Sequence, residues 1–199
     1  MKRPKVLIFK VGGTILLLIL AAFLAEVLYF TRVYAETVGL PTEEYDLVMI
    51  YSGSNHIKKT MQMALLEHVP LFESGAGEPS QDLSEAQNLL GKFKVYVDPR
   101  AKTTDQNARY SAPYLRQKGY RRVLLLNGWE QLPRALFLTR LYLIGSNVSI
   151  IPCAYSPAPK DWWNYEEAWV QIFKFWGSLG RIALHWIGVD DWPPPEWMP

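Results

Sequence analysis

Residues 120–153 read YRRVLLLNGWEQLPRALFLTRLYLIGSNVSIIPC, and this stretch decides the fold class. An apolar run, Arg122–Leu126, is followed by a loop, a helix-like segment over Gln131–Leu143 and a second apolar run, Val148–Ile151. Two strands that are joined by a helix of this length form a parallel βαβ unit. A run such as VLLL, with no polar alternation, suits a strand that is covered on both faces.

The same alternation of strand-like and helix-like segments extends toward the N-terminus. The apolar runs there are Tyr45–Tyr51, Val69–Glu73 and Phe93–Val97, and the helix-like segments are His56–Glu67, Leu83–Lys92 and Asp105–Gln117. Pro70 weakens the second run as a strand, because proline donates no hydrogen bond to a sheet. We therefore predict an α/β domain with an open, mostly parallel, Rossmann-like sheet flanked by helices.

Composition narrows the classes of function. The chain has 199 residues, enough for one ordinary domain, and a formal net charge of +2. Residues 31–199 carry 17 basic and 18 acidic side chains, so no basic surface is left for a nucleic-acid backbone. The single cysteine, Cys153, excludes an intramolecular disulfide and a thiolate zinc cluster. The three histidines share no metal-ligand spacing, and no metal is expected.

A long apolar segment follows a basic N-terminus. Residues 11–31 lie between Lys10 and Arg32 and contain one charged side chain, Glu26, which we expect near the far interface. As a helix these 21 residues are about 31 Å long, enough to cross the hydrocarbon core of a bilayer. The four basic residues ahead of the span place the N-terminus in the cytoplasm and the body of the chain outside it.

The expected organisation follows from this single span. Its parts are a basic cytoplasmic leader (1–10), a transmembrane anchor (11–31), a polar connector (32–44), the α/β domain (45–188) and a Pro/Trp-rich tail (189–199). Tyr29, Phe30 and Tyr34 are expected to lie at the membrane interface, where aromatic side chains are enriched. A cleaved signal peptide is the competing interpretation, because Val33-Tyr34-Ala35 is an acceptable cleavage site.

The C-terminal region is rich in tryptophan, with seven of the eight tryptophans between Trp162 and Trp197. Helical spacing predicts an amphipathic helix from about Tyr165 to Ile187. Its apolar stripe would consist of Tyr165, Trp169, Ile172, Phe173, Trp176, Leu179, Ala183 and Ile187, and its polar side of Glu167, Gln171, Lys174, Ser178, Arg181 and His185. We expect the apolar stripe to cover one face of the sheet. The helix could be straight or kinked at Gly177 or Gly180.

Ligands of an open parallel sheet bind beyond the carboxyl ends of its strands, so the loops there hold the candidate site. The candidate ligand-binding residues are Ser52, Gly53, Ser74, Gly75, Glu85, Thr104, Asn107, Gln131 and Arg134. Each also has a purely structural interpretation, such as a helix cap or a flexible turn. No complete GxGxxG or GxxxxGK[ST] motif is present, so no cofactor is named.

The order of these loops resembles the YdcF/SanA/ElyC family of Rossmann-like envelope proteins. The motifs that carry the resemblance are Tyr45–Val48, Ser74-Gly75, Ser84–Ala86, Ala101–Thr104 with Asn107-Ala108, and Leu132–Ala135. Two positions depart from the family: its acid before the asparagine is Gln106 here, and its histidine before the Pro-Arg-Ala motif is Gln131. An amide cannot act as a general acid or base, although it can still bind a ligand.

The resemblance implies a role in cell-envelope biogenesis, at a bacterial inner membrane, and a small anionic or nucleotide-like ligand. One hypothesis is therefore an extracytoplasmic domain that binds such a ligand, with Arg134 on a phosphate or carboxylate, Glu85 on hydroxyls and Asn107 orienting it. The alternative is a non-catalytic interaction module that docks on a partner or on the membrane through its Trp-rich C-terminus. The sequence leaves open whether any reaction is catalysed.

Overall fold

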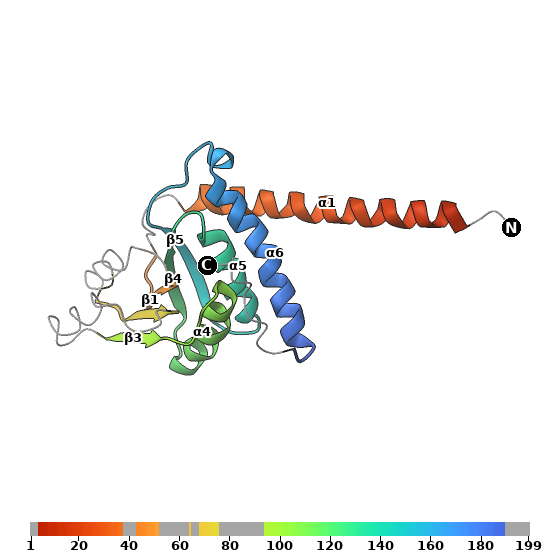
Figure 1. The fold of residues 1–199 in the computed structure, drawn as a ribbon. Helices are drawn as coiled ribbons and strands as arrows, with labels where there is room; N and C mark the ends of the chain where they lie inside the picture. The colour runs from red at the N-terminus through yellow and green to blue at the C-terminus, as the bar shows by residue number, and fades with distance from the viewer. Residues whose placement is uncertain (1–3, 38–42, 52–63, 65–67, 76–93, 190–199) are drawn as a thin grey trace.

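The computed structural model describes residues 4–37, 43–51, 64, 68–75 and 94–189, and these form an α/β domain with a long N-terminal helix (Figure 1). The helices predicted over His56–Glu67 and Leu83–Lys92 lie outside the described residues, apart from Ala64. The Pro/Trp-rich tail also lies outside them, apart from Val189.

Five strands form one parallel sheet in the order β3-β2-β1-β4-β5. They are β1 (Leu47–Tyr51), β2 (Leu71–Ser74), β3 (Val95–Asp98), β4 (Arg122–Asn127) and β5 (Ser149–Ala154). All five predicted runs are strands, and the predicted Rossmann-like α/β fold is confirmed. The order reverses between β1 and β4, which makes the carboxyl ends of these two strands the point where such folds bind ligands.

Helices cover the sheet in layers. The helices of the described residues are α1 (Pro4–Glu36), α4 (Thr104–Lys118), α5 (Leu132–Tyr142), α6 (Glu166–Trp186) and the short 3-10 turn η1 (Trp162–Asn164). One face of the sheet packs against α4 and α5, with Leu47 and Leu125 in the same core cluster as Leu115 and Leu136. The opposite face forms a second apolar cluster, in which Cys153 is buried.

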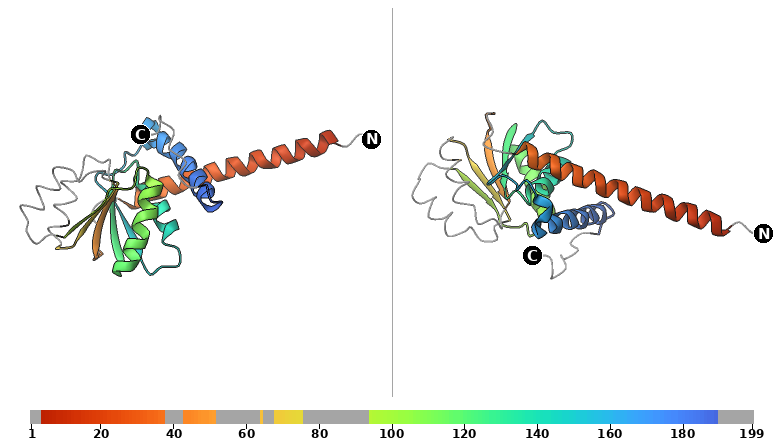
Figure 2. Two further views of the ribbon diagram at one scale, coloured as in Figure 1. Left: turned by 60° about the horizontal axis from the view of Figure 1, so that its bottom comes forward. Right: turned by 90° about the horizontal axis from the view of Figure 1, so that it is seen from above.

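The N-terminal helix is longer than the predicted span. It runs without a break over 33 residues, and its first half projects from the domain with apolar side chains exposed (Figures 1 and 2). Within Gly13–Glu36, an 18-residue window has a mean hydropathy of 2.3, and the helix is long and apolar enough to cross a membrane. The part of the chain that the structure describes thus contains one N-terminal helix that could act as a membrane anchor, as predicted.

The second half of α1 differs from the prediction. The expected connector begins as helix, because α1 continues to Glu36, where an Arg32–Glu36 ion pair of 2.6 Å stabilises the last turn. Phe30 and Tyr34 are not interfacial anchors: both are buried, and their rings meet edge to face at 6.0 Å. Glu26 is likewise buried against the domain. The end of α1 is therefore part of the domain core.

The C-terminal helix forms over the predicted residues, and it passes Gly177 and Gly180 as one helix. Its packing corrects the prediction, because α6 does not cover the sheet. It shares its core clusters with α1 and α5, outside the layer that α4 and α5 already form on that face (Figures 1 and 2). Ile172 and Phe175 are buried in this third layer, whereas Phe173 of the predicted stripe is exposed.

Truncation of Phe30 tests whether α1 belongs to the domain. Phe30 is fully buried, so Phe30→Ala should lower the free energy of unfolding by about 3–5 kcal/mol. Leu17→Ala is the matched control, since Leu17 is 68% exposed on the projecting half and should leave the domain unchanged. Thermal unfolding of the full chain in detergent, followed by tryptophan fluorescence, compares the two. Wild-type melting of Phe30→Ala would show that α1 is only a tether.

Candidate functional site

The carboxyl edge of the sheet brings several predicted site residues together. Ser74 ends β2, and its hydroxyl donates to Oδ1 of Asn107 in α4 at 3.1 Å; both residues are buried. Gly75 follows with a left-handed φ of 88°, and its N–H donates to the carbonyl of Asp98 at the end of β3. Ser52, Gly53 and Glu85 lie outside the described residues.

The start of α4 is occupied by local hydrogen bonds. Thr103 caps the helix, its hydroxyl accepting from the N–H of Gln106 at 3.2 Å, and Thr104 is the first helical residue. Gln106 Oε1 in turn accepts the N–H of Lys102 at 2.8 Å. Gln106 therefore has a structural role at this helix start.

Asp98 is paired at the same edge. The guanidinium of Arg100 donates to both carboxylate oxygens of Asp98, at 2.8 and 2.9 Å. This pairing holds the pKa of Asp98 below its usual range. Arg100 also lies 5.0 Å above the ring of Tyr110, so its charge is already engaged.

The loop after β4 leads into α5 at the switch point. Asn127 ends β4 fully buried, and its Oδ1 accepts the N–H of Gly128 at 3.0 Å. Its Nδ2 has no hydrogen-bond partner in the described part of the chain. Gln131 precedes the helix, half-buried, and its side chain makes no capping hydrogen bond. Asn127 is thus a free donor at the switch point, and sequence reasoning did not include it in the site.

Arg134 is the most unusual group of the site. It lies in the first turn of α5 and is only 7% exposed. Its Nε is buried without a hydrogen-bond partner, and no carboxylate of the described residues pairs with the guanidinium. Burial and, to a smaller extent, the neighbouring Arg181 lower the pKa of Arg134 to about 10. A guanidinium in this setting lacks the anion that normally accompanies a buried charge.

The polar side of α6 faces this arginine. Gln171, Lys174, Ser178 and Arg181 recur at intervals of three and four residues, and Gln171 and Ser178 are buried. Burial and the charge of Arg134 lower the pKa of Lys174. Burial also lowers the pKa of Arg181, whose guanidinium donates to Ser178 Oγ at 3.3 Å. Lys174 and Arg181, both on α6, therefore each lie within electrostatic reach of Arg134 on α5.

A single buried carboxylate, Asp105, lies among these charges. It accepts the hydroxyl of Tyr142 at 2.9 Å, and burial raises its pKa against the opposing effects of Tyr142, Arg181 and Arg109. Arg109 in turn contacts His185 Nδ1 at 3.0 Å. Asp105 offsets the charge of Arg181, which leaves the region around Arg134 positive in the described part of the chain.

Sequence analysis missed Lys174 and Arg181 because it assigned them to the polar side of a surface helix. The local pattern does not show which element this side meets, about forty residues from Arg134 along the chain. The signal that could have identified Lys174 and Arg181 is that charged residues cluster on one side of a helix whose other positions are aromatic.

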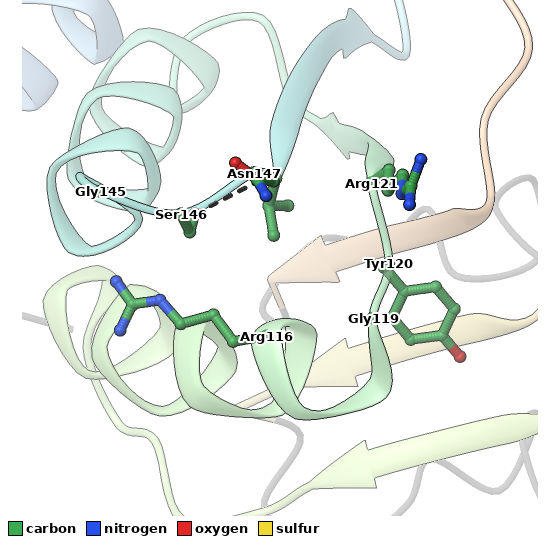
Figure 3. Close-up of a pocket in the computed structure, with 8 residues that line it drawn as sticks. Arg116, Gly119, Tyr120, Arg121, Gly145, Ser146 and Asn147 are labelled. Atoms are coloured by element: carbon green, nitrogen blue, oxygen red, sulfur yellow. Dashed lines mark hydrogen bonds between the residues drawn. The ribbon is translucent and has the colours of Figure 1, made fainter.

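A pocket of about 390 Å³ lies at the opposite edge of the sheet, between the C-terminal ends of α4 and α5 and the starts of β4 and β5 (Figure 3). Two of its polar side chains already make hydrogen bonds within the chain: Arg116 donates to the carbonyl of Tyr142, and Ser146 Oγ donates to that of Leu143. It holds none of the predicted site residues, and its position at the amino ends of the strands is not where such folds bind ligands.

No family model, curated protein or solved structure matches this chain. The likeness to the YdcF/SanA/ElyC family therefore rests on the sequence motifs alone. The class that the structure defines is a parallel, Rossmann-like α/β domain attached to an apolar N-terminal helix.

The geometry supports binding of an anion more directly than catalysis. A guanidinium can hold a phosphate or carboxylate through two parallel hydrogen bonds, and Lys174 and Arg181 add charge nearby. Gln106 and Gln131 are amides and cannot transfer a proton.

Glu73 is another buried side chain with a polar atom that lacks a hydrogen-bond partner. It lies in β2 on the face opposite α4, and its Oε2 has no hydrogen-bond partner in the part of the chain that is described. Burial raises its pKa, because the charged carboxylate is poorly solvated there.

Glu73→Gln tests whether the buried carboxylate of Glu73 destabilises the folded state when it is charged. A carboxyl whose folded-state pKa is raised contributes stability at low pH and loses it as the pH rises through the folded-state pKa. The variant should unfold with a higher free energy than wild type at pH 8, and the difference should shrink or vanish near pH 4. Urea denaturation of both chains in detergent at the two pH values measures this. A difference that does not depend on pH would contradict the burial of a titrating carboxyl.

Proposed function

We propose that this chain is a membrane-anchored protein of the bacterial cell envelope, and that its α/β domain, outside the cytoplasm, binds a small anionic ligand through Arg134. The observation that carries the proposal is the buried guanidinium, which has no anionic partner among the described residues. The family resemblance supports the envelope role, and the basic leader supports the orientation.

The neighbourhood of Arg134 supports an anion over a neutral ligand. Two like charges, Lys174 and Arg181, lie near it, and each repels the buried guanidinium more strongly than it would on a surface surrounded by water. An anion would remove this repulsion and supply the missing acceptor, so it would bind to the folded state in preference to the unfolded one. The unpaired Nδ2 of Asn127 is a further donor at the same end of the sheet.

Phosphate and pyrophosphate are the probes for this site. In thermal unfolding of the full chain in detergent, pyrophosphate should raise the melting temperature of wild type. At a pyrophosphate concentration of about 100 times the dissociation constant, binding should stabilise the folded state by about 2.7 kcal/mol. Arg134→Gln should abolish this response, and without ligand it should be at least as stable as wild type, because an unpaired buried charge is removed.

The matched control is Arg121→Gln. Arg121 is exposed and lines the pocket at the amino edge of the sheet, so its replacement should leave the pyrophosphate response intact. Comparison at constant ionic strength with chloride separates binding from the general stabilisation that phosphate salts give to folded proteins. Equal responses of wild type and Arg134→Gln would refute the site.

Orientation has its own test. An alkaline phosphatase fused to the C-terminus should be active, because this enzyme works only outside the cytoplasm. Neutral replacements of Lys2, Arg3, Lys5 and Lys10 should give mixed orientation, since these charges hold the N-terminus inside. An inactive wild-type fusion that is present in normal amounts would contradict an extracytoplasmic domain.

A further inference from the structure

One face of α6 is apolar and unburied. Trp169, Phe173, Trp176 and Ile187 lie within about 60° of one another around the helix axis, and we call them the outer stripe. Phe173 is 66% exposed, Trp176 40% and Ile187 74%, whereas Trp169 is half-buried. A contiguous exposed aromatic surface is unusual on a protein that is surrounded by water on all sides.

The outer stripe is continuous with the apolar surface of α1. Trp169 stacks on Phe23 of α1, with ring centroids 6.5 Å apart and planes 12° from parallel. One residue further along α1, Leu24 is 58% exposed. Leu24 and the nearby end of the outer stripe are therefore exposed to the same medium. In all views, α6 lies on the side of the domain from which α1 projects (Figures 1 and 2).

The depth along α1 is consistent with a lipid boundary at this level. Leu28 is the last strongly exposed apolar residue of α1, and Phe30 two residues later is buried in the domain. Phe23 and Leu28 are five residues apart, about 7.5 Å along the helix axis. Side chains that pack at the level of Phe23 would thus lie within the 5–10 Å zone that interfacial helices occupy.

We propose that the outer stripe of α6 lies in the boundary between headgroups and acyl chains of the bilayer that α1 crosses. Tryptophan and phenylalanine suit this boundary, and α6 would lie on it as an interfacial helix held in place by α1. The inference rests on the membrane anchoring in the proposed function but not on the anion site.

Site-specific fluorescence in nanodiscs tests the contact on the full chain. Cys153→Ala removes the single, buried cysteine, and Phe173→Cys then carries an environment-sensitive label. One set of discs contains lipid with a doxyl group high on the acyl chain, and a second set carries the doxyl group in the middle of the chain to reach residue 17. The label at residue 173 should lose most of its emission in the first set and shift to the blue. A label at Gln117→Cys, on the exposed last turn of α4, should be unaffected.

Leu17→Cys on the projecting half of α1 separates the two ways in which the inference can fail. Quenching at 17 and not at 173 would show that α1 crosses the bilayer while the outer stripe does not meet lipid, and a protein partner or a second copy would then cover it. No quenching at 17 would overturn both the anchor and the inference. Quenching at 17 and 173 but not at 117 is the expected result.

Discussion

The guanidinium of Arg134 is held out of water where three helices meet, and the packing of these helices determines the rest of the site. Tyr29 of α1 donates a hydrogen bond of 3.1 Å to the carbonyl of Pro133, the residue before Arg134. From the other side, α6 contributes Lys174 and Arg181. Charges of one sign separate unless other contacts hold them, and here the aromatic cluster of Phe30, Phe175 and their neighbours does so.

This arrangement makes the N-terminal helix a structural part of the domain. A tether would allow the domain to take any orientation next to a membrane, whereas a helix whose last turns are buried in the core fixes one orientation. It also links α1 to the start of α5, because Tyr29 contacts the backbone of the turn that carries Arg134. A shift of α1 along its axis would change this contact and so reach the anion site that we propose at Arg134.

The sequence predicted the five strands because each is a short apolar run, and it predicted the described helices α4, α5 and α6 because a segment of suitable length or helical spacing marks each of them. It placed Ser74, Asn107 and Arg134 at one edge of the sheet because the loops that follow parallel strands meet there. It could not predict which apolar side of α6 is buried, because Ile172 and Phe173 are adjacent and equally apolar. The sequence analysis also ended the span at residue 31, although no helix breaker occurs between Arg32 and Gly39 and α1 continues to Glu36.

Three sides of α6 point to different surroundings, so the same helix can contact both the proposed anion site and the proposed lipid boundary. Successive residues are about 100° apart, so Gln171, Ile172 and Phe173 point to three different directions. The first direction leads to the cations around Arg134, the second to the core shared with α1, and the third outward. The side that carries Lys174 and Arg181 points away from the outer stripe, so binding of an anion on the first side and contact with lipid on the third would not obstruct each other.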